Sequence, residues 1–192
     1  PLYHTLAFRK LIINLVLNSQ CFVRTSFDPK AIKNEIKEKK ISFTMMVPSQ
    51  LDKIFKTEDF KKKIFIRNLV SSSSTLSLKL KKRILKSVKG DFHECFGSSE
   101  TSIITNINYS KDIENINSIG KKIKNIHIKI NNKDELLCKS PLMFSGYLKK
   151  GKLYKQKKIT YFNTGDIVSF DKNNYLTFKS RSKEIIKVGS IS

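Results

Sequence analysis

The sequence has no tryptophan and is poor in glycine, proline and cysteine, with seven, four and three residues in a chain of 192. Cys21, Cys95 and Cys138 lie far apart and form neither a CxxC metal-binding pattern nor an even disulfide framework. We therefore expect buried, reduced thiols, as is typical of a cytoplasmic protein. Because glycine is scarce, we expect each one to stand where the backbone geometry requires it.

Long hydrophobic runs are also absent. Leu11–Leu17 is too short to cross a bilayer and contains Asn14, and no segment has the features of a signal peptide. With 39% hydrophobic and 28% charged residues, the chain can bury a substantial core as a globular domain. It begins at Pro1 rather than at a methionine, and we expect it to be a piece of a longer protein.

Negative charge is scarce, because 38 lysines and arginines face 16 acidic residues and give a net charge of +22. Such a balance makes a polyanionic partner a possibility to be weighed. The lysines, however, are spread from Lys10 to Lys187, and clusters such as Lys79–Arg83 stand beside apolar residues at helical or strand spacing. We therefore favour the interpretation that the lysines lie on solvated faces, and we expect no dedicated nucleic-acid partner. A non-catalytic basic domain that binds nucleic acid remains an alternative.

The first half of the chain alternates between helical and extended patterns. Helices are expected over Leu6–Asn18, from Pro29 to Lys39 with Asp28 as N-cap, over Ser49–Phe55 and over Ser77–Val88. Strands are expected over Ile41–Val47, Phe65–Ser71 and Asp91–Phe96. This succession of β-α-β units predicts a largely parallel sheet.

After residue 102 the pattern changes to short alternating strands separated by polar turns. These strands are expected over Ile126–Ile130, Glu135–Lys139, Ile159–Phe162, Ile167–Phe170 and Tyr175–Phe178. The predicted fold class is therefore α/β, with layers around a mainly parallel sheet followed by a small antiparallel β subdomain.

Two short polar segments could carry chemistry. In Phe96-Gly97-Ser98-Ser99-Glu100, Gly97 would let backbone N–H groups approach an anion, Ser99 would bind a phosphate oxygen and Glu100 would hold Mg²⁺. A capped helix start or a plain turn would explain the same residues.

The second segment is Thr164-Gly165-Asp166, in which a carboxylate follows a glycine. Such a carboxylate can accept two hydrogen bonds from a ribose diol. A simple hairpin turn is the alternative.

The order and spacing of these and other segments resemble the AMP-binding, acyl-CoA synthetase family, which includes firefly luciferase and the adenylation domains of peptide synthetases. The matching segments are Pro1–Thr5, Phe27–Pro48, Phe96–Glu100, Ser118–Lys121, Pro141–Tyr147, Phe162–Asp166 and Arg181–Gly189. Five of the seven glycines (Gly97, Gly120, Gly146, Gly165 and Gly189) lie within them.

The resemblance implies a two-step ligase. A carboxylic acid substrate attacks the α-phosphate of ATP, with Mg²⁺ and fixed donors stabilising the crowded phosphate, to give an acyl-adenylate and pyrophosphate. The thiol of coenzyme A then displaces AMP and forms a thioester. An adenylation domain that loads a carrier protein is an alternative with the same first step.

The resemblance also assigns roles to individual residues. Phe96 would pack on adenine, Gly97, Ser98 and Ser99 would bind the nucleotide, Glu100 would bind Mg²⁺, Asp166 and Arg181 would hold the ribose, and Lys183 would stand at the interdomain hinge. His4 would border the acyl pocket, although a lone histidine in an apolar segment is often merely packed. Residues 1–180 would be the later part of the large domain, with an α/β part over 1–102 and a β-rich part over 103–180. Residues 181–192 would be the hinge and the start of a C-terminal domain.

The sequence also departs from the family pattern. Phe96 replaces the usual tyrosine, Ser71–Ser74 stand where the family tends to have two glycines, and Asn174, Ser180 and Ser190 occupy further glycine positions. We find no Ser/Thr/Gly-rich loop with a lysine to hold the ATP phosphates, and no C-terminal domain with its adenylation lysine. We therefore expect that these 192 residues alone do not catalyse the reaction.

Overall fold

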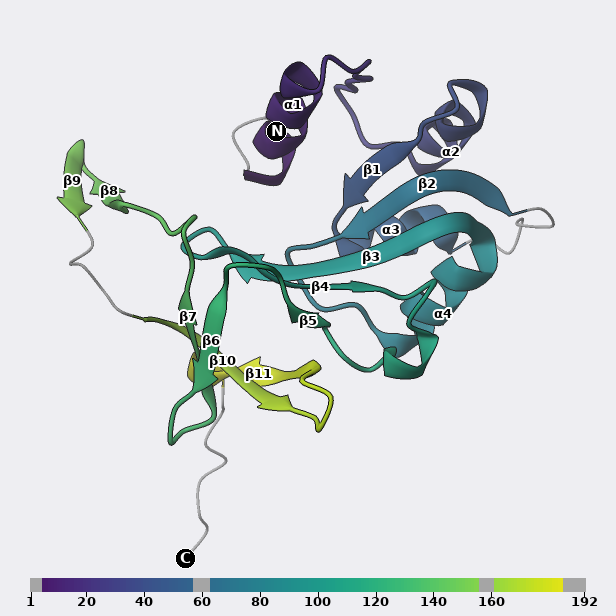
Figure 1. Cartoon of the computed structure of the whole chain (residues 1–192). Coiled ribbons are helices and arrows are strands. Elements are labelled where there is room, and N and C mark those ends of the chain that lie inside the picture. The colour runs from purple at the N-terminus through teal and green to yellow at the C-terminus, as the bar shows by residue number, and fades with distance from the viewer. Residues whose placement is uncertain (1–4, 57–62, 156–160, 185–192) are drawn as a thin grey trace, which may run out of the picture. The chain divides into compact units, whose positions relative to one another are not determined.

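The computed structural model describes residues 5–56, 63–155 and 161–184 (Figure 1). The chain divides into two compact units. Unit 1 comprises Pro1–His93 with Tyr109–Lys111, and unit 2 comprises Glu94–Asn108 with Asp112–Ser192. In the part of the chain that the structure describes, no helix is both long and apolar enough to cross a membrane.

Unit 1 is built from helices alternating with strands. Its elements are α1 (Thr5–Val16), α2 (Pro29–Glu38), β1 (Phe43–Met46), α3 (Pro48–Phe55), β2 (Ile64–Ser71), α4 (Leu78–Ser87) and the first part of β3 (Val88–Ser98). β1 and β2 pair in parallel, from Phe43 opposite Asn68 to Met46 opposite Ser71. The helix α3 joins these two parallel strands, as in a βαβ unit.

Local capping explains where two of these helices begin. The Asp28 carboxylate accepts hydrogen bonds from the backbone N–H groups of Lys30 and Ala31, at 2.9 and 3.3 Å. At α4, the hydroxyl of Ser77 accepts from Leu80 N at 3.2 Å. Both side chains satisfy helix donors that have no partner within the helix, so both starts were readable from the sequence.

One lysine of the Lys79–Arg83 cluster contradicts the expectation of a solvated face. Lys81 is only 4% exposed. Its ammonium group donates a hydrogen bond to the Tyr109 hydroxyl and lies 4.4 Å from the centre of the Tyr109 ring. The hydrogen bond and the cation–π contact compensate for the removal of the charge from water.

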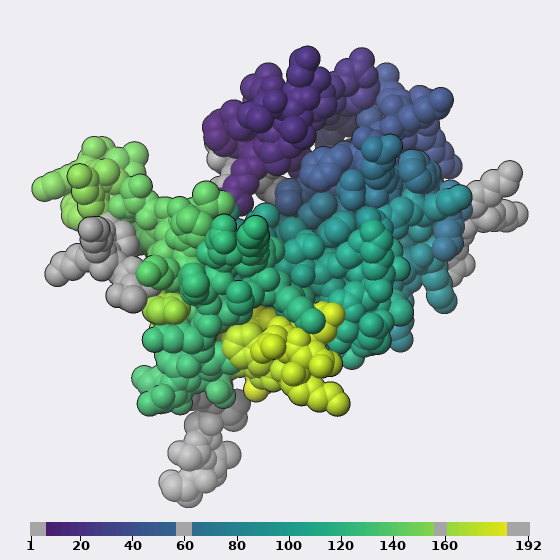
Figure 2. All heavy atoms as spheres, viewed as in Figure 1, coloured from purple at the N-terminus to yellow at the C-terminus, as the bar shows by residue number. Residues whose placement is uncertain are grey.

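Unit 2 consists mainly of antiparallel β structure. It contains the end of β3, β4 (Ser102–Asn108), β5 (Lys121–Lys122), β6 (His127–Ile130), β7 (Glu135–Lys139), β8 (Gly146–Lys149), β9 (Lys152–Lys155), β10 (Phe162–Phe170) and β11 (Leu176–Arg181), with the 3₁₀ turns η1 (Ile113–Asn115) and η2 (Ser182–Glu184). The larger sheet has the order β1-β2-β3-β4-β5, a second has the order β11-β10-β7-β6, and β8 pairs with β9. The β8–β9 hairpin forms a lobe of unit 2 in the space-filling view (Figure 2).

The core of unit 2 joins β4 to the four-stranded sheet. Its buried members are Ile104, Ile119, Ile126, Leu136, Cys138, Val168 and Leu176, and Phe96, Ile123, Ile128, Ile130 and Phe178 pack against it. Burial raises the pKa of the Cys138 thiol to about 11, as befits an unreactive core thiol. The expectation of buried cysteines is wrong for Cys21, which is exposed.

The predicted fold class, an α/β layer followed by antiparallel β structure, is confirmed. Most expected elements appear within a few residues of their predicted bounds. The strand expected over Ile159–Phe162 lies partly outside the described residues, and its last residue opens β10. β4 and the β8–β9 hairpin were not foreseen, because Asn, Lys and Gly residues interrupt their apolar patterns.

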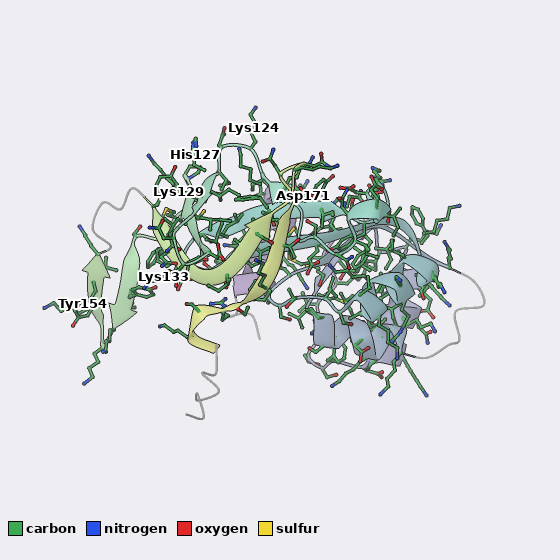
Figure 3. The ribbon with its side chains drawn as sticks, turned by 90° about the horizontal axis from the view of Figure 1, so that it is seen from below. Lys124, His127, Lys129, Lys133, Tyr154 and Asp171 are labelled. Atoms are coloured by element: carbon green, nitrogen blue, oxygen red, sulfur yellow. The ribbon has the colours of Figure 1, made fainter. Side chains whose placement is uncertain are left out.

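Basic side chains of unit 2 point into solvent from β6 and from the turns on either side of it. Lys124, His127, Lys129 and Lys133 all extend away from the ribbon (Figure 3). Lys129 also lies 4.4 Å from the centre of the Tyr161 ring. These side chains lie on a solvated face, as the sequence pattern favoured.

Candidate functional site

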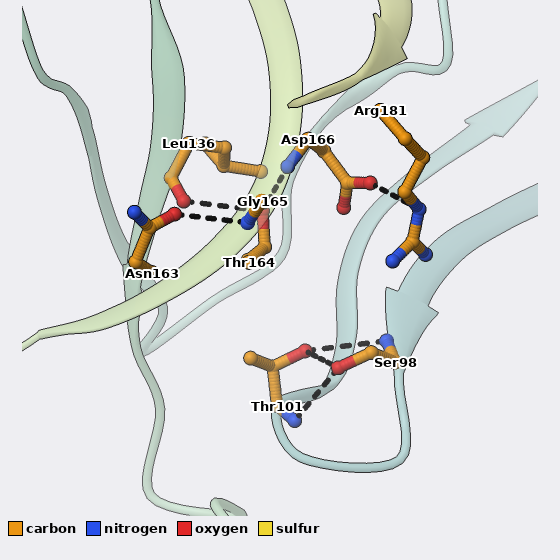
Figure 4. Close-up of polar contacts among 8 residues, drawn as sticks. All are labelled: Ser98, Thr101, Leu136, Asn163, Thr164, Gly165, Asp166 and Arg181. Carbon is orange, nitrogen blue, oxygen red and sulfur yellow. Dashed lines mark hydrogen bonds and ion pairs between the residues drawn. The ribbon is translucent and has the colours of Figure 1, made fainter. Parts of the chain in front are cut away.

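The first polar segment forms the end of β3 and the tight turn into β4. Ser98 N donates to Thr101 Oγ1 at 3.2 Å, Thr101 N donates to Ser98 Oγ at 3.3 Å, and the two hydroxyls lie 3.1 Å apart (Figure 4). Thr101 is completely buried. The Ser98 side chain therefore braces the turn, which leaves Ser99 and Glu100 at its tip.

Gly97 is needed in this segment because two backbone segments come very close. A Cβ atom at Gly97 would lie 2.0 Å from the carbonyl oxygen of Ser102 on β4. The turn leads into a strand and not into a helix, so the capped helix start is wrong. No helix dipole is available at this turn, and any anion bound there would meet hydroxyl and backbone N–H groups.

Glu100 is held by the segment that leads into β8. Its backbone oxygen accepts a hydrogen bond from Phe144 N at 2.9 Å, and its carboxylate Oε1 accepts one from the Tyr147 hydroxyl at 3.1 Å. Partial burial and the bond to Glu100 together raise the pKa of Tyr147. The second carboxylate oxygen, Oε2, has no hydrogen-bond or ion-pair partner among the described residues.

Phe96 lies where β3 meets the core of unit 2. Its ring is partly buried against that core, and its centre lies 6.2 Å from that of the Phe178 ring at an interplanar angle of 49°. Phe178 belongs to β11, the strand that ends at Arg181. This packing connects the β3–β4 turn with the end of β11 inside one compact unit.

The second polar segment is a bulge within β10 and not a hairpin turn, so the simple hairpin alternative is wrong. β10 runs without a break from Phe162 to Phe170, and its register with β7 shifts between Asn163 and Ile167. Gly165 supplies the left-handed conformation that the bulge needs, with φ of +71°.

Side-chain hydrogen bonds fix this bulge in place (Figure 4). Thr164 Oγ1 donates to Leu136 O at 3.1 Å and accepts from Asp166 N at 3.1 Å. Asn163 Oδ1 accepts from Gly165 N at 2.9 Å. The bulge therefore sets the direction of the Asp166 side chain through neighbours on both sides of the glycine.

Asp166 forms an ion pair with Arg181, the residue opposite it in the β10–β11 register. Asp166 Oδ1 and Arg181 Nε lie 2.8 Å apart, and the two side chains are 3% and 49% exposed. The guanidinium group is accessible, whereas the carboxylate is covered. A ribose could reach this buried carboxylate only after the groups that cover it had moved.

The remaining candidate residues are placed less fully. Lys183 is exposed in the 3₁₀ turn η2, directly after β11. His4 lies outside the described residues, as does the Ile185–Gly189 part of the last matching segment. Phe96, Gly97, Ser98, Ser99, Glu100, Asp166, Arg181 and Lys183 all belong to unit 2.

A magnesium ion would find only part of its ligand set in this unit. The described residues contain no group of three or more histidine, cysteine, aspartate or glutamate side chains that could hold a metal. Mg²⁺ in nucleotide sites usually takes one or two carboxylates together with phosphate oxygens and water. The single carboxylate of Glu100, with Oε2 unpaired, fits an ion that arrives with a nucleotide.

Comparison with known proteins decides the family. The sequence matches the AMP-binding enzyme family over residues 1–148. The chain belongs to this family. Among curated relatives, it is 26% identical to 4-coumarate–CoA ligase-like 6 of Arabidopsis thaliana over 97% of its own length, and 25% identical to a 2-succinylbenzoate–CoA ligase of Listeria monocytogenes over 98%. It spans only 36% and 41% of the lengths of these two proteins.

Two solved structures, of a coenzyme A synthetase and of a CoA ligase, share the fold. The O-succinylbenzoate coenzyme A synthetase of Bacillus subtilis, in complex with ATP and magnesium, superposes with a TM-score of 0.82 at 18% identity, over 98% of this chain and 42% of the other. A long-chain-fatty-acid–CoA ligase of Archaeoglobus fulgidus gives a TM-score of 0.77 at 20% identity, over 94% of this chain and 42% of the other. The family membership confirms the resemblance on which the expected site was based.

Three supporting residues of the site were missed from the sequence. Thr101 braces the β3–β4 turn, Asn163 fixes the β10 bulge and Tyr147 holds Glu100. Thr101 and Asn163 stand next to the polar segments and could have been suspected as turn-forming residues. Tyr147 lies 47 residues from Glu100, and nothing local in the sequence connects the two.

Proposed function

We infer that this chain is the nucleotide-facing part of an AMP-forming acid–thiol ligase, which activates a carboxylic acid with ATP and passes the acyl group to coenzyme A. The observation that carries the proposal is that the Glu100 carboxylate and the Asp166–Arg181 pair are both held within one compact unit, unit 2. The chain spans less than half the length of the two cited curated relatives. We therefore assign the complete reaction to the full-length protein that contains this chain.

Nucleotide binding is assigned to the β3–β4 turn and to the β10–β11 pair. The Ser99 hydroxyl, at the exposed tip of the turn, would donate to a phosphate oxygen. Arg181 would turn its exposed guanidinium group toward the nucleotide, and the Asp166 carboxylate, once uncovered, would accept both hydroxyls of a ribose. Phe96 would offer the edge or face of its ring to the adenine, while Ser98 would keep the turn in shape.

Glu100 would hold Mg²⁺ through the unpaired Oε2. When bound, the ion neutralises phosphate charge so that a carboxylate can approach the α-phosphate. Glu100 itself fixes the position of that charge, because the Phe144 and Tyr147 contacts hold its backbone and one of its oxygens. Lys183, in the 3₁₀ turn after β11, would stand at the hinge between the two half-reactions.

Coenzyme A is favoured over a carrier protein as acceptor, because one cited curated relative is named as a CoA ligase and the other as CoA ligase-like. The two names contain different acids, so the test uses a panel of aliphatic and aromatic acids.

Thioester formation by the full-length gene product tests this proposal. The protein would be incubated with ATP, Mg²⁺ and a panel of aliphatic and aromatic acids, with either coenzyme A or a phosphopantetheinylated carrier peptide as acceptor. We expect an acyl-CoA product with at least one acid and AMP as the second product. Acyl transfer to the carrier alone would select the other acceptor, and no AMP release with any acid would contradict the ligase assignment.

A further inference from the structure

β8 and the segment that leads into it clamp Glu100 at two points. Phe144 N donates to the Glu100 backbone oxygen at 2.9 Å, and the Tyr147 hydroxyl donates to Oε1 at 3.1 Å. One contact fixes the main chain at the tip of the turn and the other fixes the end of the side chain. The carboxylate is therefore oriented before any ligand is present.

Aromatic packing holds the clamp itself in place. The Phe144 and Tyr147 rings meet edge to face with centres 4.8 Å apart, and Phe144 also packs against Phe162 at the start of β10, at 5.6 Å. β10 carries the bulge that positions Asp166. The support of Glu100 and the support of Asp166 thus share one strand.

We propose that Tyr147 is the positioning residue of Glu100: its hydroxyl holds Oε1 and thereby directs Oε2 toward the cation that enters with the nucleotide. The inference rests on the proposed function, because it takes Glu100 as the magnesium ligand. Hydrogen bonds to a ligating carboxylate fix its orientation, and their loss typically costs 10- to 100-fold in metal affinity.

The strand opposite provides a matched control. Tyr154 on β9 pairs with Tyr147 in the β8–β9 register, and the two residues are 53% and 51% exposed. Directly opposed residues in antiparallel strands project from the same face. In the described part of the structure, the Tyr154 hydroxyl makes no hydrogen bond. Tyr154→Phe therefore removes an equivalent hydroxyl from the same hairpin without touching Glu100.

The first measurement is the Mg²⁺ dependence of adenylate formation by the full-length product. We expect Tyr147→Phe to raise the half-saturating Mg²⁺ concentration about tenfold, with a rate at saturating Mg²⁺ close to that of the wild type. Tyr154→Phe should leave both quantities unchanged. Equal Mg²⁺ dependence in Tyr147→Phe and Tyr154→Phe, or a lower rate at every Mg²⁺ concentration, would overturn the positioning role.

A second measurement does not depend on turnover. Mn²⁺ can be followed by electron paramagnetic resonance as it binds in the presence of a non-hydrolysable ATP analogue, and Tyr147→Phe should weaken this binding by about the same factor. In protein labelled with [ζ-¹³C]tyrosine, Glu100→Ala should move the Tyr147 resonance and leave that of Tyr154 in place. If the Tyr147 resonance does not move in Glu100→Ala, the clamp is contradicted. If the resonance moves but the wild-type protein binds no Mn²⁺ together with the ATP analogue, the proposed function is contradicted and the clamp is not.

Discussion

Asp166 and Arg181 face each other across β10 and β11, with Oδ1 and Nε 2.8 Å apart. The carboxylate is almost fully buried at 3% exposure, so it depends on this partner much more than the half-exposed guanidinium does. Removing one member of a pair in which the other is buried leaves a charge without full compensation. The pair is thus a structural element of unit 2 as well as a candidate ribose contact.

Arg181→Ala is expected to lower the free energy of unfolding by about 2 kcal/mol, because the buried Asp166 carboxylate loses its ion-pair partner. The matched control is Lys111→Ala. Lys111 also pairs with an aspartate, Asp91, at 2.9 Å, but its side chain is 71% exposed. Its removal should cost no more than about 0.5 kcal/mol. Urea unfolding of the two variants measures both values. Equal losses of stability would contradict the prediction that the pair with the buried carboxylate contributes more than the exposed pair.

Ser73 is expected to be a strained residue that glycine would relieve. It has φ of 84° and lies in the Ser71–Ser74 run, where the family tends to have glycines. Left-handed backbone costs a non-glycine residue on the order of 1 kcal/mol or more, so Ser73→Gly should raise the stability by about 1 kcal/mol. Ser74→Gly, at a position without positive φ, should lower it by about 0.5 kcal/mol. A Ser73→Gly variant that is less stable than the wild type would argue against this strain.

Gly97→Ala is expected to disrupt the β3–β4 hairpin. The added methyl group would lie 2.0 Å from Ser102 O, and only a shift of backbone can relieve the clash. We expect a loss of about 3 kcal/mol. Gly151→Ala is the comparison, because Gly151 has φ of +73° but no atom within 4 Å of the added group, so its cost should be limited to about 1 kcal/mol of backbone strain. Thermal unfolding would rank the two, and the reverse order would refute the close approach at Gly97.

The Tyr175–Asp112 hydrogen bond predicts a dependence of stability on pH. The Tyr175 hydroxyl donates to Asp112 Oδ2 at 2.6 Å, and this bond, with partial burial and nearby carboxylates, raises the pKa of Tyr175 to about 12. Because the folded-state pKa lies above the ordinary value of 10, the stabilisation is complete below pH 10 and is lost as the pH rises toward 12. The stability difference between wild type and Tyr175→Phe should be constant from about pH 7 to 9 and shrink above about pH 10.

The same bond also acts on its acceptor. Partial burial raises the pKa of Asp112, but the hydrogen bonds from Tyr175 and Asn115 and the nearby Lys121 charge outweigh it, so the pKa lies below its usual value. The contribution of Asp112 is therefore present near neutral pH and is lost in acid, as the pH falls through the lowered pKa. A pH-independent effect of Tyr175→Phe between neutral and strongly alkaline solution would contradict the pairing.

Features that depend on neighbours in the sequence were predictable. Asp28 and Ser77 cap the helices that follow them. The apolar patterns of Phe65–Ser71 and Glu135–Lys139 predicted the bounds of two strands to within one residue. The family segments also placed the candidate residues of unit 2 in the correct order. These signals are local, or they are carried by short motifs of fixed spacing.

Features that depend on distant contacts were not predictable. The Thr164-Gly165-Asp166 segment has the composition of a turn, but pairing with β7 on one side and β11 on the other keeps it within a strand as a bulge. The burial of Lys81 required Tyr109, 28 residues away. The support of Glu100 required Tyr147, and no residue near Tyr147 in the sequence indicates that its hydroxyl binds a carboxylate. Tertiary pairing decides each of these cases.

We propose that unit 2 presents Glu100 and Asp166 to the nucleotide of a carboxylate-activating enzyme. Exchange of labelled pyrophosphate into ATP by the full-length product tests it most directly, because this exchange reports adenylate formation alone. We predict exchange that requires a carboxylic acid and falls at least about 100-fold in both Glu100→Ala and Asp166→Ala, with Tyr154→Phe as an active control. Exchange that needs no acid, or that persists unchanged in both alanine variants, would contradict the claim.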